Sequence, residues 1–219
     1  ASQNATEAIS MLQVADGAYS KITDILVRMR DLATQAASGQ TEQRDKLQKE
    51  FEALQGEINR IAGSTKYGDM TLTNSDSSTG TTYTFQVGSG ISTEYDVLTM
   101  NFSSVSTGAL GVGATGASAI SIGLPGSATS AMDAIDKALS KMNSYMANVG
   151  AYQNRLQYTI ENLAVSIENF SASESAIRDA DMAYEMTQFT KNQILQQTGI
   201  AMLSQANQAP QQIMQLIGG

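Results

Sequence analysis

The sequence of 219 residues contains no cysteine, no histidine and no tryptophan. Without cysteine there is neither a disulfide nor thiolate chemistry, and without histidine the commonest general base and metal ligand is missing. No serine can be paired with a histidine, so a catalytic Ser–His–Asp triad is excluded. Because no convergent carboxylate cluster replaces these groups, we expect neither an enzyme nor a cofactor.

Positive charge is also scarce, with 13 Lys and Arg against 21 Asp and Glu and a net charge of −8. Affinity for phosphate backbones depends on clustered Lys and Arg, so no nucleic-acid partner is expected. No run of 18 apolar residues occurs, and we expect no helix that spans a membrane. The opening residues ASQNATEAIS hold neither a basic nor an apolar segment, which predicts no cleavable secretory signal.

Apolar residues recur at alternating steps of three and four within 12–36, 47–61 and 132–170. This spacing predicts long helices with coiled-coil-like seams. The seam positions expected in the core include Leu26, Met29, Phe51, Ile58, Leu156, Ile160, Leu163 and Ile167. The third helix is too long to bury itself. We expect it to lie antiparallel to the first two, which together supply a surface of similar length.

Residues 71–127 are dominated by Thr, Ser and Gly. Within them, apolar and polar residues alternate over 83–87 and 98–102, which predicts an antiparallel β element. A flexible stretch is expected over 108–126. The predicted fold class is therefore mainly α, with long antiparallel helical rods in a coiled-coil-like bundle. A small β insert separates the N- and C-terminal helical segments.

Three signals resemble functional sites. Residues 111–116 match G-x-G-x-x-G, but no strand and helix flank them as a dinucleotide site requires, so we interpret them as a linker. Asp179 and Asp181 lack further oxygen ligands for a cation, which favours a structural role at a helix junction. Other acids share a helix surface with basic residues, as ion-paired solvated surfaces do: Glu42, Asp45, Glu50 and Glu52.

The last residues, 193–219, carry no charged side chain. An apolar stripe runs through them: Ile194, Leu195, Met202, Leu203, Ile213, Met214, Leu216 and Ile217. A membrane-lying helix usually carries Lys or Arg on its polar face, and a disordered tail would not repeat Ile, Leu and Met. We therefore interpret the stripe as an interaction surface for other copies of the chain.

Several segments resemble the bacterial flagellins. ILQQTGIAMLSQANQAPQQIMQLI and the preceding AIRDADMAYEMTQFTKNQ are similar to the C-terminal signature of that family. VGAYQNRLQYTIENL resembles its long C-terminal core helix. AISMLQVADGAYSKITDILVRMRDLATQAASG and EINRIAGSTKYGDMTL resemble its two N-terminal core helices.

The resemblance implies a structural subunit that assembles into the helical tube of the flagellar filament, outside the cell. It also implies unfolded export by the flagellar type III pathway, an export chaperone that holds the C-terminal segment, and filament cap and junction proteins as partners. Flagellins of many bacteria are detected by an innate immune receptor, and the matching positions here are Arg28, Leu32, Gln35 and Glu50.

On this basis the expected domains are N-terminal core helices (1–66), an outward-facing variable insert (67–127), a long C-terminal core helix (128–180) and an assembly and chaperone-binding segment (181–219). Flagellins carry about 50 to 60 residues before the position of Ala1, including an export signal, which implies a shortened or processed form. Two alternatives remain open: a hook–filament junction protein, and a secreted adhesin or effector that binds through the insert.

Overall fold

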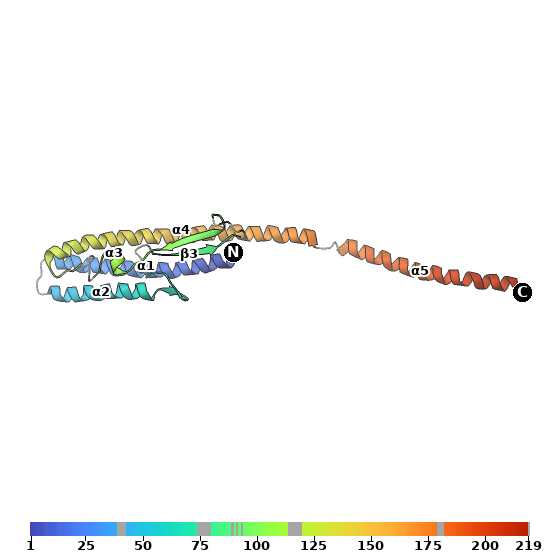
Figure 1. The fold of residues 1–219 in the computed structure, drawn as a ribbon, viewed down its shortest axis with the longest axis horizontal. Helices are drawn as coiled ribbons and strands as arrows, with labels where there is room; N and C mark the ends of the chain where they lie inside the picture. The colour runs from blue at the N-terminus through green and yellow to red at the C-terminus, as the bar shows by residue number, and fades with distance from the viewer. Residues whose placement is uncertain are drawn as a thin grey trace. The chain divides into compact units, whose positions relative to one another are not determined.

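The computed structural model divides into two units, Ala1–Val165 and Ser166–Gly219. It describes residues 1–38, 43–73, 80–88, 90, 92, 94–113, 120–178 and 182–218, without the side chains of Pro125 and residues 208–217. The elements, labelled in part in Figure 1, are α1 (Ser2–Ala37), α2 (Arg44–Ser64), β1 (Lys66–Tyr67), β2 (Met70–Thr71), β3 (Thr81–Gln86), β4 (Val97–Phe102), α3 (Thr107–Leu110), α4 (Pro125–Arg178) and α5 (Met182–Ile217).

The helices α1 and α2 form an antiparallel hairpin. An ion pair joins Arg28 of α1 to Glu50 of α2 at 2.6 Å, and the Arg44 Nε donates a hydrogen bond to the Ala36 carbonyl at 3.3 Å. Positions late in α1 therefore lie beside positions early in α2. The apolar face of α2 is buried against this partner, as the three-and-four spacing of its residues requires.

In the same unit, α4 lies antiparallel to α1 (Figure 1). The rings of Tyr19 and Tyr145 are 6.2 Å apart, and the Arg30 Nε lies 2.6 Å from the Asp136 Oδ1. Residue numbers rise along α1 as they fall along α4. The predicted class, mainly α with antiparallel rods and a small β insert, is confirmed.

The expected coverage of α4 along its whole seam is wrong. Leu156 is fully buried, and Ile160 and Leu163 are half-buried, but Ile167 is 59% exposed. Leu156, Ile160 and Leu163 belong to the unit Ala1–Val165, whose core α4 shares with α1. Ile167 belongs to the unit Ser166–Gly219 and lies outside that core.

The β insert contains the predicted hairpin. β3 and β4 pair antiparallel from Thr81 opposite Phe102 to Gln86 opposite Val97. Alternate residues of β4 face the helices, and Met100 and Phe102 belong to the same buried core as α1. This alternation is the reason the strand could be recognised in the sequence. The insert thus shares the helical core.

A second, two-residue hairpin escaped the sequence analysis. β1 and β2 pair with Tyr67 opposite Met70, across a turn formed by Gly68 and Asp69. Gly68 has φ +58°, a left-handed conformation that favours glycine. The Gly-Asp pair was the available signal, but strands of two residues show no alternation.

Side-chain amides of α2 hold the chain that follows β4. The Asn59 Oδ1 accepts hydrogen bonds from the Thr107 N–H and hydroxyl, both at 3.0 Å. The Gln55 Nε2 donates to the Val112 carbonyl at 2.8 Å, in a buried position. The expected flexible stretch is therefore wrong for residues 108–113, where α3 ends at Gly111 in a left-handed cap, φ +82°.

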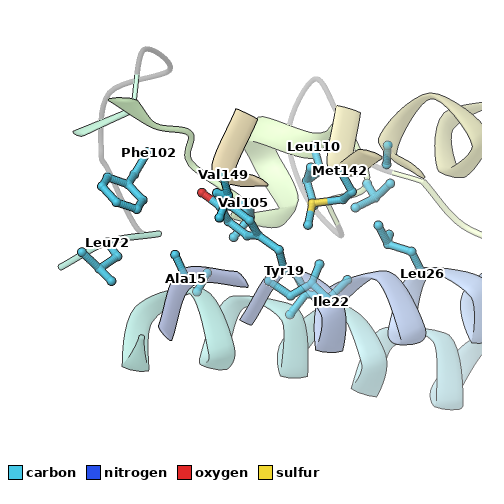
Figure 2. Packing of buried hydrophobic residues seen from close by; sticks show 14 of the residues in the cluster. Ala15, Tyr19, Ile22, Leu26, Leu72, Phe102, Val105, Leu110, Met142 and Val149 are labelled. Carbon is cyan, nitrogen blue, oxygen red and sulfur yellow. The ribbon is translucent and has the colours of Figure 1, made fainter. Parts of the chain in front are cut away.

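Tyr19 joins α1 to both the insert and α4. Its side chain is 1% exposed, and its hydroxyl donates to the Ser103 carbonyl at 3.3 Å. Figure 2 shows Tyr19 reaching from α1 to the level of Val105 and Val149. Burial raises the pKa of the Tyr19 hydroxyl well above its usual value, and the nearby Tyr145 adds to the increase.

The raised pKa predicts a loss of stability at alkaline pH. The unfolded chain releases the tyrosine proton above pH about 10, whereas the folded chain keeps it, so the full contribution is present below about pH 10 and falls above it. We expect a slope of up to about 1.4 kcal/mol per pH unit in the free energy of unfolding. Urea titrations between pH 8 and 11 measure it. Tyr19→Phe should flatten the slope, whereas Tyr158→Phe, at a 71% exposed position, should leave it unchanged.

Candidate functional site

Exposed apolar side chains are concentrated in the unit Ser166–Gly219. We call them the C-terminal apolar surface: Ile167, Phe170, Ile177, Met182, Tyr184, Met186, Phe189, Ile194, Leu195, Ile200, Met202 and Leu203. Each is between 56% and 84% exposed. A monomeric protein rarely leaves so many large apolar side chains in water, and such a surface marks an interaction site.

The surface occupies opposite sides of α5. Met182, Met186 and Phe189 follow steps of four and three and so share one face. At 3.6 residues per turn, Leu195 and Met202 lie on the opposite face. A helix with apolar side chains on opposite faces buries both of them only if it is contacted from more than one side.

Four positions of the stripe predicted from the sequence are more than half exposed: Ile194, Leu195, Met202 and Leu203. The side chains of four others lie outside the described residues: Ile213, Met214, Leu216 and Ile217. Asp179 and Asp181, assigned to a helix junction, also lie outside them, as do residues 114–116 of the glycine motif and Glu42. Gly111, the first residue of that motif, ends α3.

The seam residues named from the sequence occupy two environments. Five are fully buried in the unit Ala1–Val165: Leu26, Met29, Phe51, Ile58 and Leu156. Ile160 and Leu163 are half-buried, and Ile167 is part of the C-terminal apolar surface. The same apolar stripe of α4 is thus buried in the core at Leu156 and exposed at Ile167.

The four positions matched to receptor contact also differ in burial. Arg28 and Glu50 are joined by the ion pair between α1 and α2 and remain about half exposed, and Gln35 is exposed. Leu32 is 1% exposed. Its assignment to receptor contact is therefore wrong for the folded chain, because its side chain packs inside the core.

An open groove of about 690 Å³ lies between α1 and α2, with Val14, Ile25 and Ile61 among its apolar lining. Charged side chains at its margin pair within their own helices, Lys21 with Asp24 and Arg60 with Glu57. The hydrogen bond from Arg60 lowers the pKa of Glu57, which makes this carboxylate a weaker base than an ordinary glutamate.

The described part of the chain brings no three acidic side chains into an arrangement that could hold a metal ion. Among the described helices, none has the length and apolar character needed to cross a membrane. The geometry offers contact surface instead: a helical unit with its own core and a second unit whose apolar side chains face outward. These features define a structural protein that works through contacts with other chains.

Comparisons with known proteins agree that the chain is a structural protein. Residues 1–77 match the family model of the bacterial flagellin N-terminal helical region, and residues 132–217 match that of the C-terminal helical region. The flagellar filament 33 kDa core protein of Treponema phagedenis is 40% identical over 99% of this chain and 78% of its own length. A flagellin of Halalkalibacterium halodurans is 39% identical, over 99% of this chain and 77% of its own length.

The crystal structure of Bacillus cereus flagellin is similar to this fold, with a TM-score of 0.64 and 29% identity. The match covers 79% of this chain and 95% of that one. The chain belongs to the bacterial flagellin family, so it is a structural protein of the bacterial flagellum and not an enzyme.

Proposed function

We propose that the chain is a building subunit of the flagellar filament, in which neighbouring copies cover one another's C-terminal apolar surface. The observation that supports this most strongly is the contrast between the two units. Ala1–Val165 has a continuous buried core, whereas every apolar side chain of the C-terminal apolar surface is more than half exposed.

Burial by neighbours provides the driving force. Covering one large apolar side chain contributes about 1.5–3 kcal/mol, and the twelve residues of the surface contribute together in each subunit. Part of this gain offsets the lost freedom of the associating chains. Because α5 carries almost no charge, little ion desolvation opposes its burial. Contacts between different patches do not close, so they propagate as a helix.

Other proteins of the flagellum would use the C-terminal apolar surface as well. We propose that an export chaperone covers it before assembly, that the chain leaves the cell unfolded, and that cap and junction proteins contact it at the filament ends. The exposed Arg28, Gln35 and Glu50 are proposed as contacts for an innate immune receptor. Binding of purified chaperone and receptor to the free chain measures these two interactions.

Hydrogen exchange tests the filament proposal. In the free chain we expect the amides of residues 182–207 to exchange quickly, because the side chains of this part of α5 are largely exposed. In filaments we expect protection to rise by at least about a hundredfold, as for buried helices. Amides of residues 11–32, within the core of α1, serve as the control and should be protected in both states.

Two results would contradict the proposal. One is fast exchange of residues 182–207 in intact filaments, and the other is equal protection in the free chain. An adhesin that binds through the insert would instead lose its function when residues 75–125 are deleted and keep it when the C-terminal apolar surface is changed.

A further inference from the structure

Methionine supplies every sulfur atom of the 219 residues, which include eleven methionines and no cysteine. Histidine and tryptophan are absent as well. The thioethers are therefore the side-chain groups of this sequence that are most open to a peroxide, which oxidises methionine to its sulfoxide. The position of each thioether in the fold decides what such an oxidation would change.

The methionine side chains lie in two contrasting environments. Three in α5, Met182, Met186 and Met202, are 68%, 56% and 62% exposed. Met70 of β2 is 37% exposed, and the side chain of Met214 lies outside the described residues. The other six are in the core of the unit Ala1–Val165 or pack against it: Met11, Met29, Met100, Met132, Met142 and Met146. A reagent dissolved in water thus meets α5 before it meets the core.

The exposed thioethers of α5 occupy both sides of the C-terminal apolar surface. Met182 and Met186 lie one turn apart on one face, and at 3.6 residues per turn Met202 lies on the opposite face. Met186 also lines an open groove of about 500 Å³ together with Ile194 and Leu195. A change in these three methionines would therefore alter both faces through which α5 can contact a neighbour.

Oxidation by hydrogen peroxide turns an apolar contact into a polar one. The sulfur donates a lone pair to one peroxide oxygen, and the O–O bond breaks as the S–O bond forms. The proton of the transferred hydroxyl passes to the departing hydroxide, which leaves as water. Methionine is oxidised to the sulfoxide and the peroxide is reduced. The new oxygen is a hydrogen-bond acceptor, and burying it against apolar side chains without a donor is unfavourable.

We propose that Met182, Met186 and Met202 form a redox modification site, and that their oxidation by peroxide keeps a subunit out of the filament until the sulfoxides are reduced. The inference rests on the proposed filament function and adds a chemical regulation of the same surface. The fold shields the core methionines, so the unit Ala1–Val165 stays folded. Neighbouring copies cover the three thioethers in a filament, so the free subunit is the form that responds.

Peroxide treatment of the free, complete chain before polymerisation tests the site. At a dose that leaves Met11 and Met29 reduced, mass spectrometry should find sulfoxides at Met182, Met186 and Met202. The critical concentration for polymerisation should rise at least roughly a hundredfold, because several polar oxygens enter the covered contacts. Methionine sulfoxide reductases for both sulfoxide epimers, supplied with a thiol, should return it to within about tenfold of the untreated value.

Two triple variants assign the effect to these side chains. Met182→Leu/Met186→Leu/Met202→Leu keeps the apolar volume, so it should polymerise normally both before and after peroxide treatment. Met182→Gln/Met186→Gln/Met202→Gln introduces polar groups without an oxidant, and it should polymerise as poorly as the oxidised protein. The matched control, Met70→Leu on β2, should remain as sensitive to peroxide as the unchanged chain.

Four results would overturn the inference. They are normal polymerisation of the oxidised chain, normal polymerisation of the glutamine variant, loss of assembly when the leucine variant is oxidised, and a lower melting temperature of the unit Ala1–Val165 after oxidation. The third would assign the effect to Met70 or Met214, and the fourth would place the damage in the core. Failure of the filament proposal is recognised separately, by fast exchange of α5 amides in filaments never exposed to peroxide.

Discussion

Replacing Phe189 and Leu203 together with aspartate is expected to abolish filament formation and to leave the melting of the unit Ala1–Val165 unchanged. Both side chains are more than 60% exposed, so neither supports the folded chain on its own. In an assembled filament each would be covered. The change would then remove about 1.5–3 kcal/mol of apolar burial per side chain and add the cost of desolvating a carboxylate.

The measurement combines electron microscopy and sedimentation with thermal unfolding followed by circular dichroism. A matched control replaces Tyr95 and Leu124 with aspartate. These residues are 80% and 67% exposed, but they belong to the insert and to the turn before α4. The control should still form filaments. Normal filaments from Phe189→Asp/Leu203→Asp would show that this surface remains wet in the polymer, and the proposed assembly would be wrong.

Leu26→Ala is expected to destabilise the helical unit by about 2–5 kcal/mol, the usual cost of a cavity at a fully buried leucine. That is a large share of the total stability of a typical domain. Leu26 lies in the core cluster drawn in Figure 2, where α1 faces its packing partners. The free energy of unfolding is measured by urea titration of the free chain.

Val27 provides the control for Leu26, because the two residues are neighbours on the same helix and differ in burial. Val27 is 47% exposed, so Val27→Ala should change the free energy of unfolding by no more than about 0.5 kcal/mol. Equal effects of the two substitutions would contradict the packing described for α1.

The long helices could be predicted because their apolar residues follow the helical period over many turns. Met29 and Phe51 lie in the core for that reason. The β3–β4 hairpin was recognisable by its alternation, whereas β1–β2 was too short to show one. Residues 108–113 look flexible from their composition, yet the amides of Gln55 and Asn59 hold this region by backbone hydrogen bonds. Hydrogen bonds from single side chains produce no repeating pattern in the sequence, so they could not be predicted from it.

Composition and periodicity by themselves predicted the helical class, the lack of catalytic groups and the uncharged terminal helix. These three properties depend only on which side chains occur along the chain and how they repeat. The tertiary structure alone decided that the register of α4 leaves the core between Leu163 and Ile167, and that Leu32 is enclosed while Gln35 is not. Both outcomes depend on which helices lie side by side, and a pattern along one helix does not show which other helices pack against it.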